Sequence, residues 1–220
     1  MRALVLDFGG PVLKTPFELL RGGEARAGLP NGALSWTGPF DPASDPAWRL
    51  MQAGEITERE YWQARAEEFA RLTGGPATFP ALLDALFDAP EDELVRPRAR
   101  ALVDTARRAG LAVAVLTNDL RAFHGDVWVA RMSFLSEVDL VVDGSVEHVL
   151  KPDPRIYRLV TERLGVGAGD CLFVDDQPVN VAGAVAVGMR VLPFDVTDPD
   201  GSYDLVLAAL AEGARSAGRV

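Results

Sequence analysis

Hydrophobic residues along this chain gather in short, continuous runs that are rich in β-branched side chains. Unbroken apolarity of this kind is typical of strands buried on both faces, as in a parallel sheet, whereas half-exposed strands alternate apolar and polar positions. The pattern therefore predicts five strands, at residues 3–6, 111–116, 138–142, 171–174 and 189–192.

Helical segments separate the predicted strands, and residues suited to helix ends mark several boundaries. Residues 98–109 are followed by Gly110, and a second helix begins at Asp153 and Pro154 and ends at Gly165. Asp and Pro are favoured where helices begin, and Gly is favoured just after they end. Strands that alternate with helices predict an α/β fold with a doubly wound, mostly parallel sheet. Two more helices are predicted at residues 178–187 and 203–211.

The alternation is interrupted between the first and second predicted strands. Residues 21–45 are dense in Gly and Pro and have no clear period. We predict a core domain of residues 1–13 and 96–220, interrupted by a helical cap domain of residues 14–95. Insertions at the carboxyl edge of such a sheet lie where these folds bind ligands. Three helices are predicted in the insertion, at residues 48–51, 58–72 and 79–87.

Composition and charge narrow the classes of function. The chain has 220 residues, 48% of them hydrophobic, which is enough for one core and a sizeable insertion. Its net charge is −10 and no segment is rich in Lys or Arg, so we expect no nucleic-acid partner. No apolar stretch suits a membrane span and the first residues do not resemble a signal peptide, so we expect a cytoplasmic protein. The single cysteine, Cys171, lies in a predicted strand, where an inert thiol is expected.

Polar residues follow three of the predicted strands directly. Asp7 follows the first strand, Thr117 and Asn118 follow the second, and Asp175 and Asp176 follow the fourth. Taken alone, each is typical of a turn or a helix cap. Because the carboxyl ends of parallel strands meet at one edge of the sheet, we expect these side chains to lie together. Hydroxyl and amide groups can bind phosphate oxygens, and carboxylates suit a hard divalent cation.

Lys151 supplies a positive charge and lies between the second and fourth of these strands in the sequence. It is one of only two lysines in the chain and precedes Pro152 and Pro154, which stiffen the loop that carries it. An ammonium group held in one place suits a site where anions bind. Together these segments predict a site for a phosphate group and a divalent metal.

The order of these segments resembles that in the haloacid dehalogenase-like hydrolase superfamily, which consists mostly of Mg²⁺-dependent phosphatases. Residues 7–12, Asp-Phe-Gly-Gly-Pro-Val, match its nucleophile motif, and residues 116–118, 151–154 and 173–176 match the three motifs that follow. The insertion, with Gly-Glu-Ile-Thr at residues 54–57, is similar to the cap of the subgroup containing the phosphatase domain of soluble epoxide hydrolase. The resemblance covers nearly the whole chain and implies a Rossmann-like core with a helical cap.

The resemblance also implies a role for each motif residue. Asp7 would attack phosphorus and form an aspartyl-phosphate, which water then hydrolyses. Lys151 would neutralise charge beside Asp7, while Thr117 and Asn118 would hold the transferring phosphoryl group. The partner would be a small phosphorylated substrate, and the protein would act as a monomer or homodimer.

A Mg²⁺ cofactor would be held by Asp7, the backbone carbonyl of Gly9 and Asp176, with Asp175 beside them. Which of the two neighbouring aspartates binds the metal directly is left open. Most phosphatases of this family carry an aspartate at the position of Gly9, where it acts as the general acid for the leaving alcohol. Its replacement disfavours a phosphomutase and favours substrates with leaving groups of low pKa, such as acyl, aryl or anomeric sugar phosphates.

Several other residues could replace the missing acid, although a solvated or turn position is the ordinary expectation for each of them. Arg121 is expected on a solvated helix face, and the four tryptophans are expected to pack in the insertion. The candidate acids are Asp41, Asp45 and Glu55 in the insertion, His124 after the second motif, and His148 before Lys151.

Two other functions fit parts of the pattern. A metal-independent 2-haloacid dehalogenase uses a matching aspartate and lysine, but that branch typically has tyrosine at the position of Gly9. A catalytically degenerate protein that binds a phosphorylated ligand or a protein partner would explain Gly9, but not the retention of Asp7, Lys151 and Asp176. Metal dependence separates a phosphatase from a dehalogenase, and turnover separates both from a binding protein.

Overall fold

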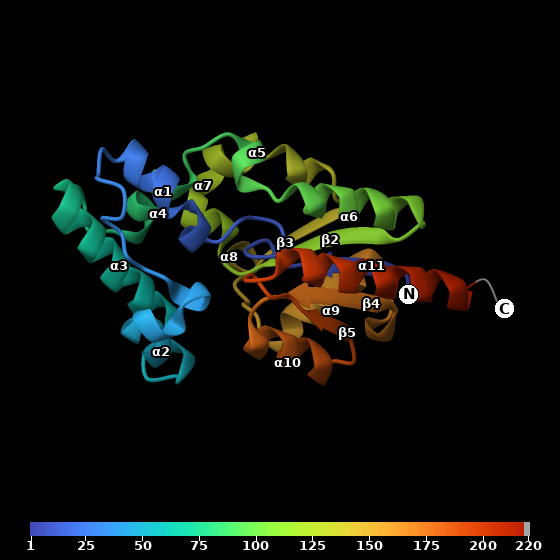
Figure 1. Ribbon diagram of the computed structural model, residues 1–220. Coiled ribbons are helices and arrows are strands. Elements are labelled where there is room, and N and C mark those ends of the chain that lie inside the picture. The colour runs from blue at the N-terminus through green and yellow to red at the C-terminus, as the bar shows by residue number, and fades with distance from the viewer. Residues whose placement is uncertain (218–220) are drawn as a thin grey trace. The chain divides into compact units, whose positions relative to one another are not determined.

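The computed structural model describes residues 1–217, and the chain forms two compact units. The sheet unit comprises Met1–Lys14 and the chain from Glu91 onward, and the helical unit comprises Thr15–Pro90. Figure 1 shows the two units by colour along the chain. No helix among residues 1–217 is long and apolar enough to cross a membrane.

The sheet unit is built on five parallel strands in the order β3-β2-β1-β4-β5, which confirms the predicted doubly wound α/β fold. Strand β1 lies at the centre, where Leu6 pairs with Val115 on one side and Val174 on the other. The carboxyl ends of the three central strands therefore lie side by side. The strands are β1 (Ala3–Leu6), β2 (Ala112–Thr117), β3 (Leu140–Asp143), β4 (Cys171–Asp175) and β5 (Arg190–Pro193).

Helices cover both faces of this sheet, which explains the unbroken apolarity of its strands. Helices α6 (Pro97–Arg108) and α11 (Pro199–Ala217) lie on one face, and α9 (Pro154–Leu164) and α10 (Pro178–Ala186) lie on the other (Figure 1). The layer beneath α9 and α10 is formed by alternate strand residues and residues of the two helices. Its fully buried members include Val5, Leu116, Phe173, Ile156, Tyr157, Val160 and Ala184.

Three further α-helices lie in the sheet unit. Helix α5 (Glu91–Leu94) re-enters it from the insertion, α7 (Leu120–Arg131) follows β2, and α8 (Gly144–Glu147) follows β3. Helix α7 is kinked at Gly125, whose φ of 74° is not helical.

The helical unit contains the three predicted helices and one more. Helix α1 (Pro16–Arg26) was not predicted, because Gly22 and Gly23 interrupt its pattern. Gly23 is needed where α1 packs on α4, since an added Cβ would lie 2.5 Å from Cδ2 of Leu86. The other helices are α2 (Pro46–Gln52), α3 (Glu58–Thr73) and α4 (Phe79–Phe87).

The chain leaves and re-enters the sheet unit through two adjacent segments. Leu13 and Val95 form an antiparallel bridge, and the backbone N–H of Lys14 donates to the carbonyl of Leu94 at 2.9 Å. The two ends of the insertion are therefore fixed to each other inside the sheet unit.

Candidate active site

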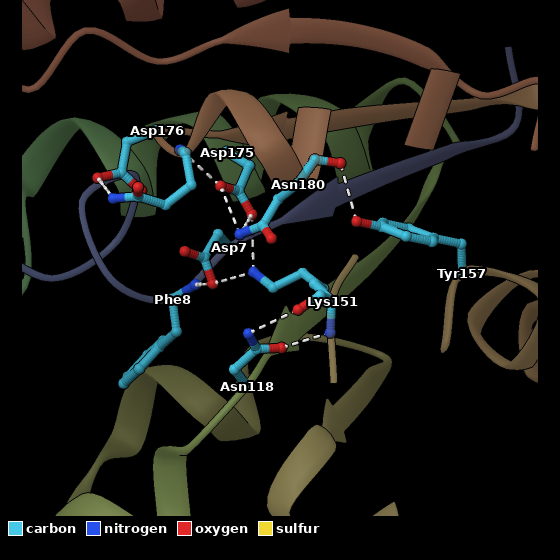
Figure 2. A network of polar contacts seen from close by, with 9 residues as sticks. Asp7, Phe8, Asn118, Lys151, Tyr157, Asp175, Asp176 and Asn180 are labelled. Carbon is cyan, nitrogen blue, oxygen red and sulfur yellow. Dashed lines mark hydrogen bonds and ion pairs between the residues drawn. The ribbon is translucent and has the colours of Figure 1, made fainter. Parts of the chain in front are cut away.

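Asp7 lies directly after β1, and its backbone N–H continues the parallel register by donating to the Val174 carbonyl at 2.8 Å. Its Oδ1 accepts from the Phe8 N–H at 2.8 Å and forms an ion pair with Lys151 Nζ at 2.7 Å (Figure 2). Among the side chains and backbone groups that the structure describes, no hydrogen-bond donor contacts Oδ2. One oxygen is therefore fixed by the protein, while the other is available to a ligand.

Lys151 is the buried cation of this site. Its Nζ lies 2.7 Å from both Asp7 Oδ1 and Asp175 Oδ2, and its side chain is 1% exposed. Asn118 accepts from the Lys151 backbone N–H at 2.7 Å and donates to its carbonyl at 3.1 Å (Figure 2). The Asn118 side chain therefore holds the lysine backbone through both its amide oxygen and its amide nitrogen.

The two neighbouring aspartates have different surroundings. Asp175 is fully buried, and its carboxylate accepts from Lys151, from the Gln177 N–H at 2.8 Å and from Asn180 Nδ2 at 3.1 Å. Asp176 accepts only from Gln177 Nε2, at 3.2 Å, among the side chains around it. Asp175 is thus occupied by protein donors, whereas Asp176 has ligand capacity to spare.

Asn180, which donates to Asp175, is itself held by residues farther from the site. The buried Tyr157 hydroxyl donates to the Asn180 carbonyl at 2.8 Å, as Figure 2 shows. Gly183 passes close to this contact, since an added Cβ would lie 2.9 Å from both the Tyr157 hydroxyl and the Pro152 carbonyl. The loop that carries Lys151 and the helix that follows Asp176 therefore pack against each other without spare room.

Carboxylates outnumber cations in the site. Oxygens of Asp7, Asp175 and Asp176 lie within 4.8 Å of one another, with Lys151 as their cationic partner. Burial raises the pKa of Asp7 to about 7, although Lys151 opposes the rise. Burial, Asp7 and Asp175 together raise the pKa of Asp176 well above its usual range. Burial alone would lower the pKa of Lys151, but the carboxylates of Asp175 and Asp7 raise it.

This donor set fits a hard divalent cation. Mg²⁺ binds through one or two carboxylates together with water and substrate oxygens, and it would supply the positive charge that Lys151 alone does not. Asp176, together with the Asp7 carboxylate, has lone pairs left with which to bind such an ion.

The two glycines after the nucleophile motif's aspartate have different surroundings. Gly10 has a φ of 81°, and an added Cβ would lie 2.9 Å from Cγ of Asp176, so only glycine fits there. At Gly9, the nearest atom to an added Cβ is Asp7 Oδ2 at 4.0 Å. There is therefore space beside Asp7 where a larger side chain could lie.

Thr117 ends β2 and is buried, and its hydroxyl makes no hydrogen bond to the described residues. In the parallel register it pairs with Asp143 at the end of β3. Asp143 accepts from the backbone N–H groups of Arg121, at 2.8 Å, and Ser145, at 3.0 Å, and so fixes the loop after Thr117. Sequence reasoning missed Asp143, although it shows the same pattern as Asp7, a carboxylate that ends an apolar strand and precedes glycine.

Asp45, a candidate acid in the insertion, has a structural role. It is 2% exposed and accepts from the Trp48 N–H at 3.0 Å, the Tyr61 hydroxyl at 2.8 Å and Arg65 at 2.5 Å. Burial would raise its pKa, but these hydrogen bonds and the Arg65 guanidinium lower it. A carboxyl group of low pKa does not serve as a general acid near neutral pH.

The other candidate acids and Arg121 lie in ordinary positions. Asp41, Glu55 and His148 are exposed, and Arg121 is exposed and pairs with Asp126. The expectation of a solvated face for Arg121 is therefore confirmed.

His124 stacks on Trp128, with ring centroids 4.1 Å apart and planes inclined by 18°. Burial lowers the pKa of His124 to about 4, which leaves the imidazole neutral near pH 7. Trp128 also contacts Phe8 edge to face at 6.5 Å, so it packs within the sheet unit and the expectation that it packs in the insertion is wrong.

The remaining three tryptophans pack in the helical unit, as expected. Trp48 and Trp62 contact the ring of Phe17 at 5.3 Å and 5.4 Å, and Trp36 donates from Nε1 to Glu68 at 2.7 Å.

Comparison with known proteins connects this geometry to a family. A family model described as haloacid dehalogenase-like hydrolase matches residues 2–188. Among solved structures, one described as a dehalogenase covers 89% of this chain and 85% of its own, with a TM-score of 0.57 and 22% identity, which supports the fold.

Three relatives are similar over part or most of the chain. Acyl-CoA dehydrogenase family member 10 of Mus musculus is 29% identical over 201 residues, which are 88% of this chain and 18% of that protein. Phosphatase MT3486 of Mycobacterium tuberculosis is 38% identical over 114 residues, 47% of this chain and 52% of that protein. Phosphoserine phosphatase of Thermus thermophilus is 31% identical over 165 residues, 73% of this chain and 64% of that protein. The matches span less than two thirds of each relative.

Proposed function

The chain belongs to the haloacid dehalogenase-like hydrolase family, and from that premise we propose that it is a Mg²⁺-dependent phosphatase acting on a small phosphorylated metabolite. Two relatives are named as phosphatases, which supports a phosphoric ester as the substrate. The observation that carries the proposal is the cluster in which Lys151 bridges Asp7 and Asp175 while Asp176 has ligand capacity to spare.

Asp7 is the proposed nucleophile. Its Oδ1 is held by Phe8 and Lys151, so Oδ2 can attack phosphorus. The new bond joins Oδ2 to phosphorus while the bond to the leaving oxygen breaks, which yields an aspartyl-phosphate and the leaving group. Water then attacks the phosphoryl group, releases inorganic phosphate and restores the carboxylate.

Asp7, Asp176 and the backbone carbonyl of Gly9 are the proposed ligands of Mg²⁺. When bound, Mg²⁺ would offset the repulsion between the phosphate and the Asp7 carboxylate. Asp175 is assigned a different task, because its oxygens already hold Lys151, Gln177 and Asn180.

The phosphoryl group is assigned to Lys151 and to the uncommitted hydroxyl of Thr117. Asn118 is assigned mainly a positioning role, because its side chain holds the backbone of Lys151. This refines the sequence-based expectation, in which the Asn118 amide contacts phosphate directly.

The space at Gly9 leads us to propose leaving groups of low pKa. No side chain there can protonate a departing alkoxide, and positioned acid catalysis is typically worth about 10²–10⁴-fold. The leaving groups of acyl, aryl and anomeric sugar phosphates have lower pKa values and depend less on such protonation. The helical unit, inserted directly after the Asp7 loop, is the proposed cap that selects among them.

Release of inorganic phosphate from aryl, acyl, sugar and alkyl phosphates tests the proposal. Each compound is assayed with Mg²⁺, with EDTA and with the Asp7→Asn variant, and halide release from a 2-haloacid is measured in parallel. Phosphate release that is lost with EDTA and with the variant is the expected result. Halide release that persists in EDTA would instead establish a dehalogenase, and a folded protein that binds Mg²⁺ without turnover would establish a binding function.

A further inference from the structure

Arg96 lies on the segment that returns from the helical unit and directly precedes α6. It is 6% exposed, and its backbone N–H donates to the Val12 carbonyl at 2.9 Å. A buried guanidinium is costly unless its N–H groups are bonded and its charge is compensated. Its position before a helix does not by itself account for the burial of this side chain.

The Arg96 side chain holds the loop that follows Asp7. Its Nε donates to the Gly10 carbonyl at 2.7 Å, and its guanidinium lies over the Phe194 ring, 5.8 Å from the centroid. The Phe194 N–H in turn donates to the Asp175 carbonyl at 3.0 Å. Arg96 thus connects the loop after β1 to the end of β4, where the acidic pair lies.

Gly10 is the point at which this contact reaches the proposed metal ligands. An added Cβ at Gly10 would lie 2.9 Å from Cγ of Asp176, so the loop and that carboxylate are already in close approach. The carbonyl of Gly9 belongs to the peptide group that joins Gly9 to Gly10. A shift of Gly10 would therefore move one proposed ligand and change the room available to another.

We infer that Arg96 is a positioning residue that holds Gly10 against Asp176 and thereby sets the affinity of the site for Mg²⁺. The inference rests on the proposed function, since it concerns the metal ligands proposed above. An arginine suits this task because its planar guanidinium stays charged, stacks on an aromatic ring and directs Nε–H at a fixed angle. A lysine offers none of these constraints.

The test compares Arg96→Gln and Arg96→Lys with Arg98→Gln in the full chain. Arg98 lies two residues further on, in the first turn of α6, and pairs with Asp200 and Asp204. Calorimetric titration with Mg²⁺ alone, without substrate, should show binding weakened by roughly 10–100-fold in both Arg96 variants, as is typical when support for metal ligands is lost. Arg98→Gln should bind Mg²⁺ as the parent does.

Two further readouts separate positioning from general destabilisation. Hydrogen exchange at Leu13, whose N–H donates to the Phe8 carbonyl at 2.7 Å, should accelerate in the Arg96 variants and not in Arg98→Gln. Saturating Mg²⁺ should restore the kcat of the Arg96 variants to within a few-fold of the parent, since the defect lies in metal affinity.

Folded Arg96 variants with unchanged Mg²⁺ affinity would overturn this inference and leave the proposed function intact. If Arg96→Gln does not fold, Arg96→Lys decides the question, because it keeps a positive charge and loses the planar guanidinium with its fixed Nε–H. A parent protein that binds no Mg²⁺ would overturn the proposed function, and this inference with it.

Discussion

Two buried aspartates, one in each unit, have pKa values shifted in opposite directions, although burial alone would raise both. Asp45 in the helical unit accepts from Trp48, Tyr61 and Arg65, and its pKa is lowered. Asp7 in the sheet unit keeps one oxygen without a protein donor, and burial raises its pKa to about 7.

The difference lies in how the surrounding charges balance. Around Asp45, the donors and one arginine satisfy the carboxylate, which is what a structural network requires. Around Asp7, three carboxylates face one ammonium group, and the imbalance is stable only if a cation or a proton is added. Perturbation of this kind is characteristic of functional sites.

The largest effect is expected from Asp7→Asn, which removes the proposed nucleophile. Phosphate release should fall by at least about 10³-fold, because losing a nucleophile typically costs this much or more. The metal-free variant should nevertheless melt at a higher temperature than the parent at pH 8, because one repelling carboxylate is gone. A variant that loses both activity and stability would break the comparison, since Asp7 would then also be a structural residue.

Asp45→Ala should have the opposite profile. It leaves Arg65 and the Tyr61 hydroxyl without their buried partner, and breaking such a pair typically costs about 3–5 kcal/mol of unfolding free energy. Chemical denaturation measures this loss, and Tyr61→Phe serves as the milder control that removes one hydrogen bond. If Asp45→Ala remains as stable as the parent, the network around Asp45 is not structural.

Gly9→Asp should sharpen the contrast by adding an acid to the site. Gly9 has no positive φ, and the space beside Asp7 accepts a Cβ, so the substitution brings no backbone strain. Turnover of alkyl phosphates should rise by roughly 10–100-fold relative to aryl phosphates, because alkoxides need a proton to depart. Gly9→Asn, which has the same shape without the acid, is the control. An equal gain in both variants would show that the leaving group is not limiting.

The pH dependence of the melting temperature should also distinguish Asp7 from Asp45, although the expected effect is smaller than those of the substitutions above. A carboxyl group whose folded-state pKa is raised stabilises the fold below its unfolded value and loses that contribution as the pH rises through the folded value. For Asp7 the window runs from 3.8 to about 7. In EDTA, the melting temperature of the parent should therefore fall relative to Asp7→Asn across this window, by roughly 2–5 °C.

Asp45 has the opposite sign and provides the control for that measurement. Its lowered pKa gives stability that is present above its ordinary value of 3.8 and lost only as the pH falls through the folded value. The difference between the parent and Asp45→Ala should stay constant between pH 5 and 8. A slope of the same sign at both positions would contradict the charge balance described above.

The sheet unit could be predicted largely from the sequence because local and global requirements agree there. Ala3–Leu6 forms a strand at the predicted residues, since every one of its side chains is buried. Gly165 ends α9 as predicted, in the left-handed conformation that glycine favours. The order of the motif residues along the chain was enough to predict that Asp7, Lys151 and Asp175 lie together, as they do.

Other features depend on contacts between distant residues and left no readable pattern. Gly23 weakens the helical signal of α1, yet it is what allows α1 to approach Leu86. The commitment of Asn118 to the backbone of Lys151 follows from the meeting of two loops. The hydrogen bond from Arg96 to the Gly10 carbonyl joins residues 86 positions apart, and no local sequence motif predicts it.

The bridge between Leu13 and Val95 allows the sequence of the helical unit to evolve separately from that of the sheet unit. Because the inserted chain departs and returns at paired positions, its length and sequence can vary without altering the register of β1 against β2 and β4. Mutations in the helical unit are thus insulated from the strands that carry Asp7 and Asp175. One module can diversify while the other preserves its chemistry, so new specificities can arise without rebuilding the reaction centre.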